Sequence, residues 1–283
     1  MNHSLLHLPE RVEVLEILQN IAMKLADLVM AVIPRPVPNA DVLAECKIIS
    51  HRGEFDNIAV KENTLAAFRH ASGHGVWGIE CDIRWTSDLT PVVCHDADTG
   101  RVFGTCLILS ETHFSDLREQ LPQIPTLAEV VAEFGGNTHL MLEIKEERYP
   151  QLQRQAQILE DTLAALEPAE DYHFLALDPD LFLRARHAPK SSCLPVAELN
   201  VKRLSRASLL ENFCGLSGHY LLLGNSLLAK HNQQGQQIGT GFISSRNCLF
   251  RELNRGVQWI FSNDAVRIQK ILDLYLQRSR PQK

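Results

Sequence analysis

The stretch GIECDIRW, residues 78–85, is where the prediction of both fold and site begins. Its apolar residues predict a β-strand, and its two acids, Glu80 and Asp82, stand two positions apart. Because side chains along a strand alternate between its two faces, both carboxylates point the same way. Two like charges so placed are costly unless a positive charge lies between them. A divalent cation with oxygen ligands would supply that charge, and a solvent-facing pair of acids on an edge strand is the structural alternative.

Strand-like and helix-like segments alternate on both sides of this stretch along nearly the whole chain. Such alternation predicts parallel β/α units joined by right-handed crossovers. Residues 91–95 are expected to form an extra strand beside the second one. We predict an α/β fold, a (β/α)8 TIM barrel over residues 46–283, with a doubly wound open sheet as the alternative. The eight barrel strands are expected to start at Lys47, Gly78, His139, His173, Cys193, Tyr220, Gln237 and Trp259.

Residues 1–45 are expected to lie outside this single barrel domain. Between Glu10 and Ile33 apolar residues recur at helical spacing, which predicts an extra N-terminal amphipathic helix. Charged residues interrupt it, so it is too polar to span a bilayer. A Pro-rich linker follows at residues 34–38. We expect the helix to pack on the barrel; contact of residues 10–33 with a membrane surface is disfavoured because their polar face is not rich in Lys and Arg.

Composition excludes some classes of protein. The net charge of −6 over 283 residues argues against a nucleic-acid-binding protein, which would carry a basic stripe. The 7 cysteines form no CxxC pair and mostly lie in apolar runs, which indicates buried thiols in a reducing compartment. The N-terminus lacks the basic and apolar regions of a secretory signal. We therefore expect a cytoplasmic location.

Polar side chains gather where the predicted strands end, and catalytic groups of a (β/α)8 barrel lie at the carboxyl ends of its strands. A single histidine in such a place is usually structural, but convergence of this many polar groups on one rim indicates an active site. They are His51 and Arg52 after the first strand, Glu80 and Asp82 on the second, His95 on the extra strand, and Glu143 and Lys145 on the strand HLMLEIK.

The chemistry of this set favours cleavage of a phosphodiester. Three carboxylates without cysteine or paired histidine ligands suit Mg²⁺ or Ca²⁺ better than Zn²⁺. Arg52 offers a planar fork for phosphate oxygens, and Lys145 offers a point charge. Two histidines can act as general base and general acid near neutral pH. Together these groups would neutralise charge on phosphorus while protons move at the attacking and leaving oxygens.

Spaced motifs in the chain resemble the glycerophosphodiester phosphodiesterase family. The specific ones are HRG (51–53), ENTLAAF (62–68), GIECDIRWTSDLTPVVCHD (78–96), IPTLAEV (124–130) and LEIK (142–145). Weaker similarity continues through LDPDLFLRAR (177–186), AKHNQQGQQI (229–238) and GVQWIFSNDAVRI (256–268). The resemblance therefore covers about residues 46 to 275 and follows the order of motifs in the family.

The resemblance implies a TIM barrel that hydrolyses glycerophosphodiesters to sn-glycerol 3-phosphate and an alcohol, either directly or through a cyclic intermediate. By motif, it assigns His51 and His95 as the acid/base pair. It assigns Glu80, Asp82 and Glu143 to one divalent cation, Mg²⁺ or Ca²⁺. Arg52 and Lys145 would bind the phosphate.

Two stretches depart from the family pattern. Where the family carries a Trp-Thr-Val-Asn run, this chain has Gly241-Phe242-Ile243-Ser244, so Phe242 is expected to replace the substrate-binding ring. The last strand ends in Ser262-Asn263 instead of Thr-Asp. The segment between His95 and Pro125 is short, which would leave room for bulkier substrates. Two alternatives therefore stand beside the family activity: a lysophospholipase-D-like enzyme acting on lysolipids, and a barrel that binds phosphodiesters without turnover.

Overall fold

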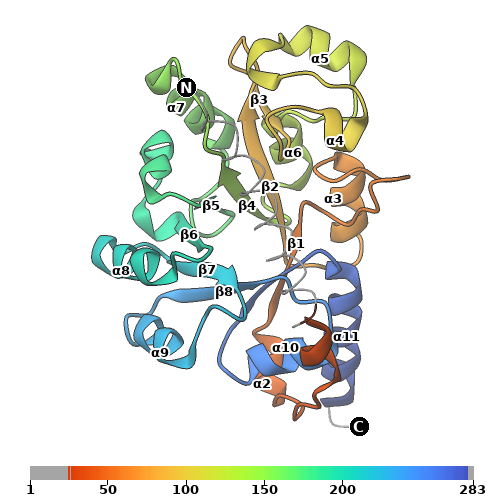
Figure 1. Cartoon of the computed structure of the whole chain (residues 1–283), viewed down its shortest axis with the longest axis vertical. Helices are drawn as coiled ribbons and strands as arrows, with labels where there is room; N and C mark the ends of the chain where they lie inside the picture. The colour runs from red at the N-terminus through yellow and green to blue at the C-terminus, as the bar shows by residue number, and fades with distance from the viewer. Residues whose placement is uncertain (1–24, 26, 280–283) are drawn as a thin grey trace, which may run out of the picture.

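Eight parallel strands close into a barrel in the computed structural model, which describes residues 25 and 27–279 (Figure 1). Strand β1 pairs with β9 on one side and with β2 on the other, so the sheet has no open break between its first and last strands. The predicted TIM barrel is therefore confirmed over the open sheet. The strands are β1 (Lys47–His51), β2 (Gly78–Trp85), β4 (His139–Ile144), β5 (Tyr172–Ala176), β6 (Cys193–Ala197), β7 (Gly215–His219), β8 (Gln237–Gly241) and β9 (Trp259–Ser262).

The predicted extra strand is also present. Strand β3 (Pro91–Val93) runs antiparallel to the end of β2, with Val93 opposite Ile83. It begins an excursion between β2 and α6 that holds a small apolar core of its own, built around Leu109 and Leu117. The excursion contains α4 (Gly100–Phe103), η1 (Leu109–Glu111) and α5 (Phe114–Gln120).

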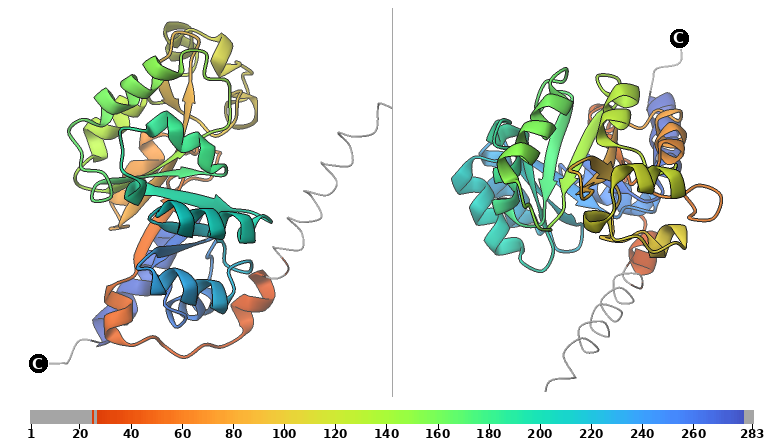
Figure 2. Two further views of the ribbon diagram at one scale, coloured as in Figure 1. Left: turned by 90° about the vertical axis from the view of Figure 1, so that its left-hand side faces the viewer. Right: turned by 90° about the horizontal axis from the view of Figure 1, so that it is seen from above.

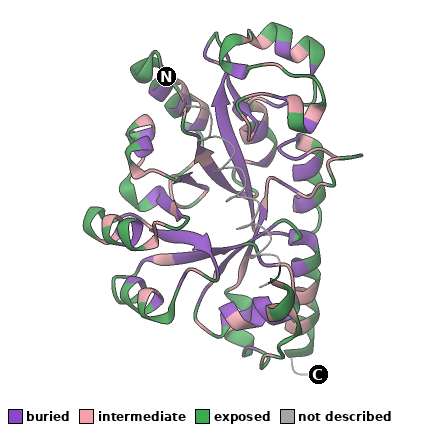
Figure 3. Cartoon of the chain, viewed as in Figure 1, coloured by how far each residue is buried: buried purple, intermediate pink, exposed green. Residues whose placement is uncertain are grey.

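Helices surround the barrel and bury one face each against the strands, as the purple strands and green outer helix faces in Figure 3 show. Several begin at side chains that cap the helix: Thr64 caps α3, and Thr126 with Glu129 forms a capping box at α6. The remaining apolar space inside the barrel is filled by residues such as Met141, Leu194 and Phe261. The elements are α3 (Leu65–Ser72), α6 (Leu127–Phe134), α7 (Leu152–Leu163), η2 (Pro179–Ala185), η3 (Lys190–Ser192), α8 (Val201–Glu211), α9 (Asn225–Gln233), α10 (Arg246–Leu253) and α11 (Ala265–Ser279).

One predicted strand was wrong. A strand was expected to start at Tyr220, but β7 is the preceding stretch Gly215–His219, between β6 and β8. Its small residues suit that place, because a Cβ at Gly215 would overlap the backbone of Gln237 in β8. The apolar run after it is a loop whose Tyr220 and Leu223 are buried among the outer helices. An apolar run therefore indicated burial correctly and strand structure incorrectly.

In the N-terminal region the structure describes residue 25 and the residues from 27 onwards. Most of the predicted helix at 10–33 therefore lies outside the described residues. Residues 27–32 are helical, and a second short helix, α2 (Ala40–Ala44), capped by Asn39, follows the predicted linker. The side-chain amides of Asn247 on α10 and of Asn254, directly after it, donate to Ala31 O at 2.7 Å and to Pro36 O at 2.8 Å. This segment runs along the lower edge of the molecule in the left view of Figure 2. Within the described chain, no helix is both long and apolar enough to cross a membrane.

A histidine pair lies near the amino-terminal ends of the strands. The Nδ1–H of His139 donates to Glu170 O at 2.9 Å, so its Nε2 accepts a hydrogen bond from His173 Nδ1–H at 2.8 Å. Trp77 stacks on His139 with 4.1 Å between ring centroids, and the Lys47 ammonium lies 4.4 Å from the Trp77 centroid. Both imidazoles are therefore neutral in the folded chain, in a place where a proton would be costly.

Lowering the pH is expected to destabilise the fold through this pair. Burial lowers the pKa of His139 to about 4 and that of His173 to about 3, against an ordinary 6.5. The unfolded chain binds these protons at a higher pH than the folded chain does. The free energy of unfolding should therefore fall as the pH drops through about 6.5 towards 4, by roughly 2–6 kcal/mol for the pair.

Urea titrations of the native protein and of a His139→Gln/His173→Gln double variant at a series of pH values measure this contribution. The double variant should show a shallower dependence of unfolding free energy on pH. The variant His70→Gln, at an exposed position on α3, serves as the control. Parallel pH dependences for the double variant and the native protein would contradict the assignment.

Candidate active site

The predicted site residues meet at the carboxyl ends of the barrel strands, around a cavity of about 250 Å³. Asp82 is fully buried beside this cavity, and its carboxylate contacts Lys145 and Arg52 at the cavity wall. The other predicted residues line it directly: His51, Arg52, Glu80, His95, Glu143, Lys145 and Phe242. All the residues singled out from the sequence are thus brought together.

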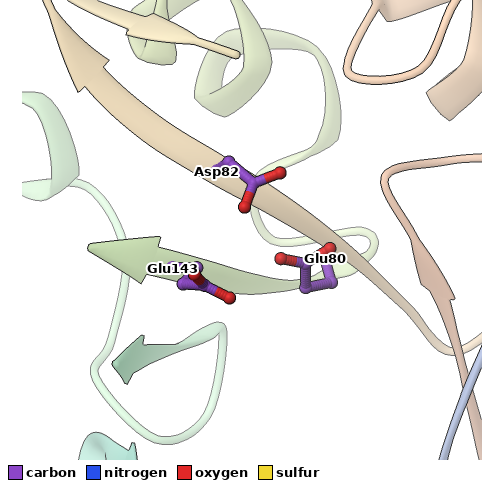
Figure 4. A group of neighbouring side chains, drawn as sticks. All are labelled: Glu80, Asp82 and Glu143. Atoms are coloured by element: carbon purple, nitrogen blue, oxygen red, sulfur yellow. The ribbon is translucent and has the colours of Figure 1, made fainter. Parts of the chain in front are cut away.

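Three carboxylates converge at the base of the site (Figure 4). Glu80 and Asp82 come from β2, and Glu143 lies directly beside Asp82 on the neighbouring strand β4. One carboxylate oxygen from each lies within 4.8 Å of the others. Burial, then the charges of Asp82 and Glu143, raises the pKa of Glu80 well above its usual value, and burial with Asp82 raises that of Glu143. Glu80 Oε1 is buried with no hydrogen-bond partner among the described residues.

Two cationic side chains offset part of this negative charge. Lys145 Nζ donates to Asp82 Oδ1 at 3.0 Å and to Glu143 Oε1 at 2.6 Å. Arg52 Nε lies 3.3 Å from Asp82 Oδ2. Burial alone would raise the pKa of Asp82, but Lys145 and Arg52 lower it below its usual range. Asp82 is therefore the carboxylate that these two cations hold ionised, whereas among the described residues only one oxygen of Glu80, Oε2, accepts a hydrogen bond.

The HRG motif owes its sequence to the shape of the turn after β1. Arg52 and Gly53 both have positive φ angles, 60° and 82°. A Cβ at Gly53 would lie 2.7 Å from Ala67 Cβ, so only glycine fits against α3. The turn lets the Arg52 N–H donate to Glu80 Oε2 at 3.1 Å while its guanidinium faces the cavity.

The ENT motif, residues 62–64, contacts site residues and holds them in position. Glu62 accepts from Arg52 at 3.1 Å and from Arg101 at 2.7 Å, which fixes the Arg52 guanidinium. Asn63 Nδ2 donates to Asp82 Oδ2 at 2.7 Å. The two polar neighbours of Glu62 thus differ in role: Thr64 caps α3, and Asn63 orients a site carboxylate.

His51 is held by the end of the last strand. Its Nδ1–H donates to Asn263 Oδ1 at 2.6 Å, which leaves Nε2 free to accept a proton, 3.8 Å from Glu80 Oε2. Burial, followed by the charge of Arg52, lowers the pKa of His51 to about 4, so it is neutral at pH 7. The edge of the Phe242 ring packs against it at 5.2 Å between centroids.

His95 is held by a carboxylate. Its Nδ1 is 2.7 Å from Asp96 Oδ1, and the other oxygen of Asp96 accepts from Arg101 Nε at 2.5 Å. Arg84 Nε donates to the carbonyl oxygen of His95 at 2.8 Å, which positions the loop after β3. Burial lowers the pKa of His95 below its usual value, and the charge of Asp82 followed by the hydrogen bond to Asp96 acts in the opposite direction.

Sequence reasoning missed the supporting roles of Glu62, Asn63, Asp96 and Asn263. Signals for three segments were present: the ENT motif, the acid after His95, and the departure at 262–263. None of them indicated the partner of each side chain. His219 was missed without a signal; it lines the cavity at the end of β7, and its Nδ1 accepts from Leu221 N–H at 3.3 Å.

Comparison with known proteins agrees with this geometry. Residues 51–232, more than half of the chain, match the glycerophosphoryl diester phosphodiesterase family. The chain belongs to this family. Glycerophosphodiester phosphodiesterase 1 of Homo sapiens is 30% identical over 189 residues, which are 55% of this chain and 55% of the human protein. The chain thus spans about half the length of this curated relative.

Solved structures of this family share the barrel. A glycerophosphodiester phosphodiesterase from Thermotoga maritima superposes with a TM-score of 0.67 and 22% identity, covering 80% of this chain and 98% of that one. An Oleispira antarctica phosphodiesterase, solved in complex with the product sn-glycerol-3-phosphate, gives a TM-score of 0.68 and 20% identity over 80% and 96% of the two chains. At these identities the likeness establishes the fold.

The donor set fits a divalent cation with oxygen ligands, because three buried carboxylates meet and two of them have raised pKa values. Adding Mg²⁺ or Ca²⁺ to chelator-treated protein should therefore raise its melting temperature. A cation present at a hundred times its dissociation constant stabilises the folded state by about 2.7 kcal/mol, a shift of a few degrees for a chain of this size.

The variant Glu80→Gln should lose most of this shift, because it removes one charged ligand without changing the size of the side chain. Glu119→Gln, at an exposed position on α5, should keep it. Differential scanning fluorimetry with each ion and with EDTA measures both. Equal shifts in the two variants would place the ion elsewhere.

Proposed function

We propose that this chain hydrolyses glycerophosphodiesters to sn-glycerol 3-phosphate and an alcohol, with one divalent cation, Mg²⁺ or Ca²⁺. The observation that carries the proposal is the meeting of three carboxylates, two cations and two oriented histidines around one cavity. Family membership supports the reaction, and the glycerol phosphate bound to the Oleispira antarctica relative supports the product.

Glu80, Asp82 and Glu143 would hold the cation. When bound, it would neutralise charge that develops on the phosphoryl oxygens. Arg52 and Lys145 line the same cavity and would bind the phosphate, Arg52 through its planar guanidinium and Lys145 as a point charge. Phe242 packs on His51 and would fix the substrate beside that ring.

The two histidines have different surroundings, and these suit different roles. The neutral ring of His51 presents an unprotonated Nε2 and would accept the proton of the attacking hydroxyl, whether from water or from the neighbouring glycerol hydroxyl. The ring of His95 contacts the Asp96 carboxylate, which offsets part of the effect by which burial lowers the pKa of this ring, and His95 would donate a proton to the leaving alkoxide. Asp96 and Asn263 would be positioning residues.

The first test offers the purified protein glycerophosphocholine and glycerophosphoethanolamine in a coupled assay for glycerol 3-phosphate. Release of product that EDTA abolishes and that Mg²⁺ or Ca²⁺ restores is the expected result. Product release that EDTA does not affect would contradict the role of the three carboxylates.

Replacing either histidine tests the assignment of roles. His51→Ala and His95→Ala should each lower kcat by about 10²–10⁴-fold, the usual contribution of a general acid or base. His70→Ala on the outer surface is the matched control. Native protein that turns over no diester would support the alternative of a binding barrel without catalysis, and unchanged kcat in both site variants would refute the assigned roles.

A further inference from the structure

The short helix that precedes the barrel, residues 27–32, is fixed to the body of the molecule by one of its faces. The Tyr220 hydroxyl donates to Asp27 Oδ1, and the Asn247 side-chain amide donates to Ala31 O at 2.7 Å. Met30 packs against the buried cluster that includes Tyr220. Asp27, Met30 and Ala31 stand three and four positions apart, so they share the face that contacts the barrel.

The opposite face of this helix is apolar and lies in water. It consists of Leu25, Leu28, Val29 and Val32, whose exposed fractions are 59%, 64%, 56% and 69%. Positions three, four and seven residues apart share one side of a helix, so these side chains form a single stripe. An amphipathic helix ordinarily buries such a stripe in the core of its own domain. Here the helix contacts the barrel with its other face and leaves the stripe exposed.

The same spacing continues in the sequence before the helix. Alternating steps of four and three residues lead through the apolar positions Val14, Leu18, Ile21, Leu25, Leu28 and Val32. The first three positions precede the described residues, so this continuation is read from the sequence alone. Alternation of three and four is the heptad pattern, with which one helix packs along another through a continuous apolar seam.

We propose that this stripe is the contact surface for a second copy of the chain, with residues 14–32 of the two copies packed along each other as helices. Both copies would present the same surface, as the two-fold symmetry of most homodimers requires. The inference goes beyond the proposed function and does not depend on it.

The stability of the helix argues that the stripe has a partner. Isolated helices shorter than about 12–15 residues are marginal in water, and helices in proteins gain most of their stability by burying an apolar face. On the face that contacts the barrel, the apolar side chains are those of Met30 and Ala31, and both are only half-buried. The larger apolar area is on the exposed stripe, where a second copy would bury it.

The charges of the segment favour a second copy over a membrane surface. Helices that lie on membranes are rich in Lys and Arg, because anionic lipids attract them. Acids outnumber bases between residues 10 and 33, which hold Glu10, Glu13, Glu16 and Asp27 against Arg11 and Lys24. None of these charges stands at a position of the heptad stripe. Contact between two such stripes therefore buries no charge, whereas an anionic lipid surface would repel the segment.

The oligomeric state of the full chain tests the proposal. Sedimentation by analytical ultracentrifugation is measured from about 1 to about 100 µM, a range that detects dissociation constants in the micromolar region. The mass of one chain is 31.9 kDa. We expect the native protein to reach twice this mass within the range.

Variants on the stripe link the association to its residues. Leu25→Gln/Leu28→Gln should weaken self-association by about 100-fold or more, because two large apolar side chains of the contact become polar. Glutamine retains nearly the helix propensity of leucine, and both positions are exposed in the single chain, so this variant should fold as the native protein does. Circular dichroism and the melting temperature of dilute protein check its folding.

The matched control is Leu183→Gln/Leu210→Gln, which changes two leucines that are 63% and 69% exposed on η2 and α8. It should associate as strongly as the native protein. A native protein that keeps the mass of one chain throughout the concentration range would overturn the inference. Association of Leu25→Gln/Leu28→Gln at native strength would also overturn it.

A membrane surface is the competing occupant, and vesicles of phosphatidylcholine with phosphatidylserine test it. Binding of a monomeric native protein to these vesicles, lost in Leu25→Gln/Leu28→Gln, would assign the stripe to lipid and refute the second copy. None of these measurements uses the rate of hydrolysis, so failure of this inference and failure of the proposed function are distinguishable.

Discussion

Electrostatic repulsion among three buried carboxylates is the constraint on which the rest of the site depends. Glu80, Asp82 and Glu143 have oxygens within 4.8 Å of one another in the interior of the barrel mouth. Charges so close and so poorly hydrated cannot all be ionised without cations beside them. Lys145 and Arg52 compensate Asp82 most directly, whereas burial and the charges of Asp82 and Glu143 raise the pKa of Glu80.

Much of the surrounding chain holds these cations and carboxylates in place. Arg52 reaches the site because the turn after β1 takes positive φ angles at Arg52 and Gly53, and Gly53 has no room for a side chain. Glu62 then fixes the Arg52 guanidinium, and Asn63 fixes Asp82. A site of opposed charges needs this support, because a displaced partner would leave a buried charge uncompensated.

The histidines extend the same arrangement towards the cavity. In both histidines the Nδ1 atom contacts a side-chain oxygen, of Asn263 for His51 and of Asp96 for His95. Asn263 is neutral and Asp96 is charged, so the two rings have different electrostatic surroundings. In the proposed reaction, this difference would suit His51 to accept a proton and His95 to donate one.

The sequence by itself determined the barrel, seven of its eight strand positions, and the residues that meet in the site. Local rules suffice for these: strand periodicity puts Glu80 and Asp82 on one face, and parallel strands bring Glu143 and Lys145 to the same end of the barrel. The local rule that an apolar run forms a strand failed at β7. Close contact with β8 requires small residues in β7, and the apolar run that follows β7 forms an outer loop.

Only the tertiary structure decided which partner each side chain of the candidate site has. His51 and Asn263 are 212 positions apart, and they meet because β1 and β9 are neighbours in the closed barrel. Asp82 meets Asn63 because the turn after β1 folds back on β2. Hydrogen bonds and burial act over a few ångströms in space, so no spacing along the chain could reveal them.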